Sequence, residues 1–196
     1  MAQFLPAYNY MMDSEDAPRK YLPVADPVRV MPGDPPDVAQ RKQTAQAISG
    51  INSYTWPADF ERILSCGPGE LARAYAVQQF YQSKYWTPLL LAQMNDQTVA
   101  NCVLDDGVNQ GDGTDVRLLQ KAVNDVWTAN TSGPEPLYLD EDGAMGPLTV
   151  AGVNSCAAAS LLLAFEMRRI ADYERIGGPD VAAWVARAKR WRGMAV

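Results

Sequence analysis

The acidic side chains are the groups in this sequence best able to do hydrolytic chemistry, because it contains no histidine. Without imidazole, the Ser-His-Asp and Cys-His nucleophile systems are excluded, since imidazole must take the proton of the nucleophile. The usual histidine-ligated zinc sites are excluded as well. The cysteines Cys66, Cys102 and Cys156 are far apart with no CxxC spacing, so no zinc cluster is expected, and their odd number argues against a disulfide framework. A hydrolase of this composition must work with carboxylates, hydroxyls and water.

One carboxylate stands between two amides at helical spacing. Asn101, Asp105 and Asn109 follow one another every fourth residue, so their side chains share one face of a helix predicted from Asp96 to Gln110. The positions beside this stripe are mostly apolar, which indicates a helix built for burial. The stripe is therefore either the wall of a polar groove or an ordinary solvent-facing surface.

The elements that must position such side chains are predicted to be helices. Apolar residues recur at helical spacing between Gly69 and Trp86, and again further along the chain. Further helices are predicted at Thr114–Trp127, Pro147–Asn154, Ala157–Ile176 and Pro179–Arg192. No segment alternates with period two for long enough to form a large sheet. The fold class is therefore predicted to be mainly α.

Two segments interrupt the helical pattern. Residues 17–37 are rich in proline, which lacks a backbone donor and favours extended conformations before it, so an irregular surface arm is expected. Such an arm is either functional or a disordered spacer. The segment Asp142 to Thr149, DGAMGPLT, predicts a tight loop that starts a helix, because its glycines permit turns and Pro147 suits a first helical turn.

The expected compartment and the net charge of the chain limit the molecules that it can bind. The N-terminus lacks the basic start and apolar stretch of a signal peptide, and no apolar run approaches 18 residues, so cytoplasmic synthesis without stable membrane insertion is expected. The net charge is −6, which gives no support to nucleic-acid binding. Near the C-terminus, Arg187, Lys189, Arg190 and Arg192 form either a solvated helix face or a surface that approaches anionic envelope polymers.

Several segments together resemble glycoside hydrolase family 108, the muramidases whose C-terminal half is described as a peptidoglycan-binding domain. The resemblance is best from about residue 75 to 190. Its carriers are QQFYQSKYWTPL (Gln78–Leu89), VLDDGVNQG (Val103–Gly111), LLQKAVN (Leu118–Asn124), DEDGAMGPLT (Asp140–Thr149), FEMRRIADYERI (Phe165–Ile176) and AWVARA (Ala183–Ala188).

The resemblance implies a lysozyme-like helical fold and carboxylate chemistry on glycan strands. It places Glu15 at the family's catalytic glutamate, although this chain has Glu15, Asp16 and Ala17 in place of the family's EGG motif. Glycoside hydrolysis needs a protonated acid and a second carboxylate. Asp26 fits the family's Asp-containing loop best for the second role, with Asp16, Asp34 and Asp105 as rivals.

The resemblance also suggests residues that bind substrate. Ser49 and Asn52, in AISGIN (Ala47–Asn52), fall near the family's polar residues, in either of two registers. Asp105 and Asn109 align with a family helix, where they bind substrate or tie the two halves together. Among the available aromatic side chains, Tyr85 is taken as substrate-binding, and Tyr54, Trp56 and Trp86 are further candidates or core residues.

These observations lead to one expected function and two alternatives. We expect an endolysin-like N-acetylmuramidase, phage-like in origin, that cleaves between N-acetylmuramic acid and N-acetylglucosamine without metal or cofactor. Residues 1–92 would form the catalytic part and residues 93–196 the peptidoglycan-binding part, with the two packed as one compact unit. It would act at the cell wall or in the periplasm, with a holin or secretion machinery as possible partner. The alternatives are a catalytically degenerate wall-binding or virion structural protein, and a lytic transglycosylase.

Overall fold

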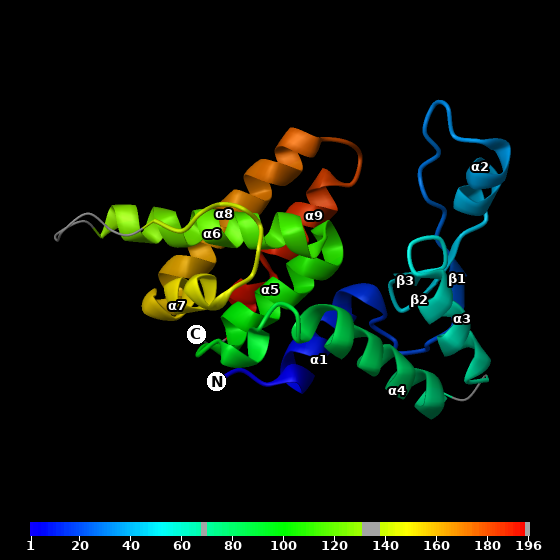
Figure 1. The fold of residues 1–196 in the computed structure, drawn as a ribbon, viewed down its shortest axis with the longest axis horizontal. Helices are drawn as coiled ribbons and strands as arrows, with labels where there is room; N and C mark the ends of the chain where they lie inside the picture. Colours follow the sequence, from blue (N-terminus) through cyan, green and yellow to red (C-terminus); the bar gives the residue numbers. More distant parts are fainter. Residues whose placement is uncertain (68–69, 131–137, 195–196) are drawn as a thin grey trace. The chain divides into compact units, whose positions relative to one another are not determined.

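The computed structural model describes residues 1–67, 70–130 and 138–194, and the chain divides into two compact units (Figure 1). The unit of residues 12–82 is called the small unit here. Residues 1–11 together with the chain from residue 83 onwards form the helical unit. Helix α1 (Phe4–Glu15) contributes to both. These structural units are distinct from the predicted catalytic part (residues 1–92) and peptidoglycan-binding part (residues 93–196), and that functional division stays a prediction.

The small unit combines three helices with a three-stranded sheet. Its elements after α1 are β1 (Pro23–Ala25), α2 (Pro36–Gln43), β2 (Gln46–Ile48), β3 (Ile51–Asn52), α3 (Pro57–Ser65) and α4 (Glu70–Tyr81). The strands are antiparallel in the order β1-β2-β3, and Ile48 pairs with Ile51 at the end of the β2–β3 hairpin. Apolar side chains from both strands and helices, such as Ile48, Ile63 and Val77, are fully buried and form its core.

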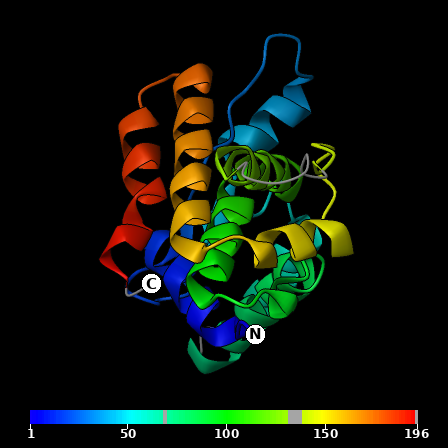
Figure 2. The same cartoon turned by 90° about the vertical axis from the view of Figure 1, so that its left-hand side faces the viewer.

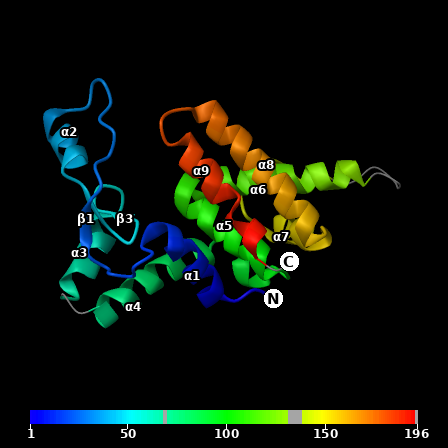
Figure 3. The same cartoon turned by 180° about the vertical axis from the view of Figure 1, so that it is seen from behind.

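The helical unit is arranged around α5 (Gln97–Gln110), which is buried continuously from Thr98 to Gly107. Figure 3 shows α5 among α6, α8 and α9, and Figure 2 shows α8 and α9 side by side in orange and red. The other elements from residue 82 onwards are η1 (Gln82–Trp86), η2 (Leu91–Gln93), α6 (Asp112–Ala129), α7 (Pro147–Ser155), α8 (Ala158–Ile176), α9 (Val181–Ala188) and η3 (Arg190–Gly193). A helix that is buried on all sides requires such neighbours around it, including partners for its buried polar side chains.

The mainly α fold class is confirmed, and the helices predicted after residue 95 are present with small shifts of their ends. The expectation of a wholly irregular arm at residues 17–37 was wrong, because this segment contains β1 and the start of α2. Proline is compatible with both places. Pro23 is the first residue of an outer strand, and Pro36 lies in the first turn of a helix.

Within the described ranges, no single helix is long and apolar enough to cross a membrane. Only the bent pair α7 and α8, at 117° to each other, passes such a test when the two helices are counted together.

The C-terminal arginines are bound to other parts of the helical unit by ion pairs and hydrogen bonds. Arg187 Nη2 lies 3.0 Å from Asp105 Oδ1, and Arg192 Nη2 lies 2.8 Å from Glu166 Oε1. Both carboxylates are buried. Arg190 donates to the backbone oxygen of Tyr10 at 2.8 Å. Both sequence interpretations of this cluster were therefore wrong for Arg187, whose side chain is 16% exposed, whereas Arg192 pairs with Glu166 and is still 55% exposed.

The loop at DGAMGPLT has the tight form that its glycines predict. Gly143 has φ +77°, and a Cβ there would lie 2.5 Å from the backbone oxygen of Gly113. Asp142 Oδ1 accepts hydrogen bonds from the Ala144 backbone N–H and from Gln120 Nε2, both at 2.8 Å. Both hydrogen bonds lower the pKa of Asp142 from its ordinary value, and the bond from the Ala144 N–H has the larger effect.

This lowered pKa predicts a loop that loosens only in acid. Since the folded pKa is depressed, ionised Asp142 stabilises the loop fully above the ordinary value of 3.8, and this stabilisation is lost as the pH falls through the lower folded value. We expect the Ala144 amide resonance to stay constant down to about pH 4 and to move only in stronger acid. In Asp142→Asn this acid transition should be absent. A midpoint above 3.8 would contradict the assignment.

Candidate active site

An open cavity of about 660 Å³ in the small unit brings together three of the residues that the sequence indicated. Glu15, Asp26 and Ser49 all line it, although they come from the end of α1, the segment after β1 and the turn between β2 and β3. The polar side chains in its lining are Glu15, Asp16, Lys20, Asp26 and Ser49. The cavity is thus a depression with acidic side chains from separate elements.

Glu15 is the last residue of α1 and is half-buried. Its carboxylate lies directly against the backbone of Gly50, because a Cβ on Gly50 would lie 2.4 Å from Glu15 Oε2. Gly50 also has φ +82°, a conformation that glycine adopts without strain. Only glycine at this position lets the carboxylate approach the turn so closely.

The turn that meets Glu15 is a two-residue hairpin loop of Ser49 and Gly50. Both residues have positive φ, 49° and 82°, as in a type I′ turn, whose twist matches that of the strands. Serine in this conformation costs about 1 to 3 kcal/mol. Two hydrogen bonds offset the cost. Ser49 Oγ donates to Asp16 Oδ2 at 2.8 Å, and Tyr81 donates to the Ser49 backbone oxygen at 2.6 Å.

Asp16, one rival for the second carboxylate, is already occupied by three donors. Its Oδ2 accepts from Ser49 Oγ and from the Tyr21 N–H at 2.9 Å, and its Oδ1 accepts from the Lys20 N–H at 3.2 Å. These bonds fix the chain after α1, where Arg19 and Tyr21 have positive φ. Asp16 therefore holds the turn of the cavity in place.

Asp26 is exposed and has a single side-chain donor in the described contacts. Asn52 Nδ2 lies 2.7 Å from Asp26 Oδ2 and also 2.9 Å from the Asp26 backbone oxygen. Asn52 is itself buried, and its Oδ1 accepts from the Tyr54 N–H at 2.8 Å. The amide therefore orients Asp26 and leaves most of that carboxylate open to the cavity.

The rival Asp34 is engaged outside the cavity. Lys42 Nζ lies 2.8 Å from its Oδ2, and the hydrogen bond from Lys42 lowers the pKa of Asp34. Asp34 does not line the cavity. Its role in the structure is to hold the segment before α2 against that helix.

Three other predicted residues lie outside the small unit. Tyr85 is in η1, and Asp105 and Asn109 are in α5. Asp105 has no exposed surface and pairs with Arg187 and Arg169. The sequence interpretation placed Asp105 on a groove wall or on a solvent-facing surface, and for this residue it was wrong. Its face of α5 points into the helical unit.

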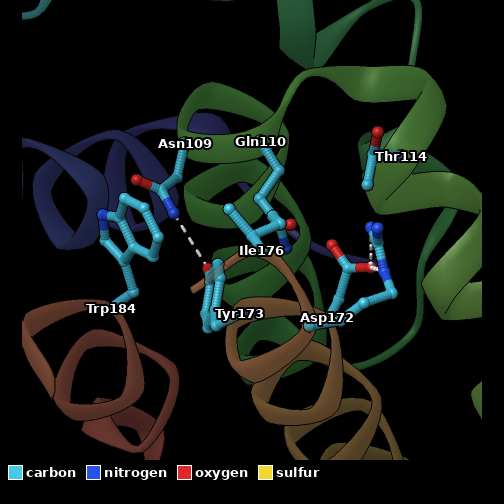
Figure 4. Close-up of a pocket in the computed structure, with 8 residues that line it drawn as sticks. Asn109, Gln110, Thr114, Asp172, Tyr173, Ile176 and Trp184 are labelled. Carbon is cyan, nitrogen blue, oxygen red and sulfur yellow. Dashed lines mark hydrogen bonds and ion pairs between the residues drawn. The ribbon is translucent and has the colours of Figure 1, made fainter. Parts of the chain in front are cut away.

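Asn109 lines a second pocket, of about 310 Å³, in the helical unit (Figure 4). Its Nδ2 donates to the Tyr173 hydroxyl at 2.9 Å, and that hydroxyl donates to Asp106 Oδ1 at 3.0 Å. Burial raises the pKa of Tyr173 to about 12. The Trp184 ring lies 5.6 Å from the Tyr173 ring. Asn109 therefore connects α5 with α8 at the wall of this pocket.

Sequence reasoning selected the residues in these bonds but missed the contacts by which they hold the cavity together. The bonds of Asp16 to Ser49 and of Asn52 to Asp26 join positions 33 and 26 residues apart. One local signal was available, since Ser-Gly between two isoleucines is typical of a tight hairpin turn. Tyr81 carries no such signal, because an aromatic residue in a helix is usually a core residue.

The two cavity carboxylates stand in different surroundings, which is the arrangement that separates an acid from a base. Glu15 is half-buried against the backbone of Gly50, whereas Asp26 is exposed and held by one amide. A half-buried carboxyl suits proton donation, and an exposed carboxylate suits activation of water or stabilisation of positive charge.

Comparison with known proteins agrees with the resemblance found in the sequence. The family model "Glycosyl hydrolase 108" matches residues 39–111, which confirms the similarity to that family of glycoside hydrolases over this segment. The match includes Ser49, Asn52 and Tyr85, whereas Glu15 and Asp26 precede it. No curated protein matches the chain. The predicted peptidoglycan-binding role of the C-terminal half stays a prediction.

Among solved structures, the chain is similar to SagA of Brucella abortus. The TM-score is 0.62 and the sequence identity is 21%, with 96% of this chain and 91% of that chain covered. At this identity the similarity shows a shared fold.

Proposed function

We propose that the chain is a peptidoglycan hydrolase of the N-acetylmuramidase type, with Glu15 as the general acid and Asp26 as the second carboxylate. The observation that carries the proposal is the cavity that both carboxylates line, where each is positioned by a different set of contacts. The Ser49–Gly50 turn lies against Glu15, and Asn52 orients Asp26. The match to glycosyl hydrolase family 108 supports a glycosidic bond as the target.

In the proposed reaction, protonated Glu15 gives its proton to the oxygen of the bond between N-acetylmuramic acid and N-acetylglucosamine. The bond from the muramic acid C1 to this oxygen breaks, and positive charge develops on the sugar ring. Asp26 stabilises this charge or takes a proton from the attacking water. The products are a free N-acetylglucosamine hydroxyl and a reducing muramic acid end.

The proposed substrate lies in the bacterial cell wall. An endolysin-like protein, of phage or phage-like origin, would reach it from the cytoplasm through a holin lesion or a secretion machinery. The three free cysteines agree with synthesis in a reducing compartment. Residues 93–196 would then contribute binding to the wall.

Digestion of purified peptidoglycan, followed by mass analysis of the soluble fragments, tests this proposal. We expect muropeptides with reducing muramic acid ends. Anhydro-muramic ends would instead identify a lytic transglycosylase, which uses one carboxyl group. Sedimentation with peptidoglycan without released fragments would identify a wall-binding protein that lacks turnover. Either of the last two results contradicts the proposal.

A further inference from the structure

The second pocket, of about 310 Å³, lies where four helices of the helical unit meet (Figure 4). Gln110 is at the end of α5, the start of α6 forms one wall, and Trp184 comes from α9. From α8 come Asp172, Tyr173 and Ile176. Ligand pockets in proteins begin at about 300 Å³, so this space suits one ring-sized group.

Two side-chain oxygens at this pocket have no hydrogen-bond donor among the residues that the structure describes. They are Gln110 Oε1 and Asp172 Oδ2, and both atoms are buried. Gln110 Nε2 donates to both oxygens of the Asp106 carboxylate at 3.1 Å, so the amide oxygen must point elsewhere. Asp172 Oδ1 accepts from Arg175 Nε at 3.0 Å and from Nη2 at 2.6 Å. Because a buried acceptor without a donor costs free energy, a bound molecule that brings donors to these oxygens is favoured.

The ion pair of Asp172 and Arg175 indicates the charge of such a molecule. Among the described residues of the lining, these two are the charged ones. Since the guanidinium already neutralises the carboxylate, a cationic ligand would be repelled by Arg175, whereas a neutral ligand with O–H or N–H donors would not. Asp106, behind Gln110, is balanced by Arg169 at 2.6 Å. The Arg175 side chain is 72% exposed, so it can move and admit a donor to Asp172.

An aromatic and apolar surface lines the same space. The Trp184 ring is half-buried, and it lies 5.6 Å from the ring of Tyr173, which is almost completely buried. Ile176 is 52% exposed and adds aliphatic surface. Figure 4 shows Trp184 and Asp172 on opposite sides of Tyr173 and Ile176. The pocket therefore offers an aromatic face at one side and hydrogen-bond acceptors at the other.

We propose that this pocket binds one N-acetylated sugar ring of a glycan, with the C–H face of the ring on Trp184 and its donors toward Gln110 Oε1 and Asp172 Oδ2. A sugar of this kind is neutral, and its hydroxyl and acetamido groups supply O–H and N–H donors. The inference rests on the proposed function only for the source of the glycan, the bacterial wall. It assigns a binding site in the helical unit that is separate from the cavity of Glu15 and Asp26.

Titration with N-acetylglucosamine, followed by NMR of the tryptophan indole N–H groups, tests the proposal. The Trp184 signal is identified as the one that is absent from the variant Trp184→Phe. We expect this signal to shift and saturate, with a Kd on the order of 1 mM for a single ring. The signal of Trp127, whose indole donates to Ser155 Oγ at 3.1 Å and which does not line the pocket, should stay in place.

The variant Asp172→Asn reverses one hydrogen-bonding group of the pocket while keeping its size. The amide oxygen would face the donors of Arg175, so an N–H group would replace the acceptor that faces the ligand. We expect Kd to rise about tenfold or more. Asp59→Asn is the matched control, because Asp59 also pairs with an arginine three residues later, Arg62 at 3.2 Å, and does not line the pocket. It should leave Kd unchanged.

The absence of a saturable shift at Trp184 in the unaltered protein would overturn the proposal, and so would equal affinities of the unaltered protein and Asp172→Asn. Butylamine tests a cationic ligand. A shift of the Trp184 signal by butylamine without one by N-acetylglucosamine would identify an ammonium site and reject the sugar site. Release of fragments from peptidoglycan is scored separately. Release without sugar binding at Trp184 contradicts this inference alone, whereas sugar binding without release contradicts the proposed function alone.

Discussion

Replacing Glu15 by glutamine should reduce the release of peptidoglycan fragments by about 10² to 10⁴-fold, which is the usual contribution of a general acid. Glutamine has the size of glutamate but no acidic proton, so it preserves the contact with Gly50 while removing the proton donor. Initial rates of fragment release, measured by mass spectrometry, give the effect. The melting temperature and the sedimentation of the variant with peptidoglycan should remain close to those of the unaltered protein.

Glu61→Gln is the matched control for this substitution. Glu61 is an exposed residue of α3 in the same unit, and it does not line the cavity. Its replacement should leave the rate unchanged. Normal digestion by Glu15→Gln would mean that another group donates the proton, and the assignment of this cavity as the active site would have to be withdrawn.

Replacing Asp105 by asparagine should lower the free energy of unfolding by about 3 to 5 kcal/mol, as expected when one partner of a buried ion pair is removed. Asp105 has no exposed surface. Its carboxylate oxygens accept from Arg187 Nε at 3.1 and 3.2 Å, and Arg169 Nη2 lies 3.5 Å from Oδ2. Asparagine keeps the size but removes the negative charge that faces Arg187 and Arg169, although Arg169 retains its ion pair with Asp106 at 2.6 Å. Urea denaturation followed by circular dichroism measures the loss.

Asp125→Asn gives the comparison for an exposed pair in the same unit. Arg168 binds Asp125 with both side chains about 40% exposed. Such a pair contributes about 1 kcal/mol or less. A loss for Asp105→Asn that is no larger than the loss for Asp125→Asn would show that the buried cluster does not stabilise the helical unit.

The helices of the helical unit could be predicted because their apolar residues recur at helical spacing over several turns. In α6, for example, Val116, Leu119, Val123 and Val126 are all buried. The sheet could not be predicted, because strands of two and three residues are too short for a period-two pattern to emerge. The hairpin depends instead on the Ser49–Gly50 turn, whose sequence signal spans two residues.

The candidate site was predictable only in part. Glu15, Asp26 and Ser49 were selected through the family resemblance, and they line one cavity. Their roles remain proposals. The contacts that orient them were not predictable, because Asn52 and Asp26 are separated by 26 residues along the chain. Arg187 was misinterpreted for the same reason, since its partner Asp105 is 82 residues away along the chain.

The long-range bonds of the C-terminal arginines have a consequence for the order of folding during synthesis. The small unit is one continuous segment, residues 12–82, and is complete as soon as that segment has been made. The helical unit begins with residues 1–11, yet the Tyr10 backbone oxygen meets Arg190 only 180 residues later. At about 5 to 20 residues per second, the 180 residues between Tyr10 and Arg190 take about 9 to 36 seconds to be made. The helical unit, which contains the first eleven residues, is therefore completed after the small unit.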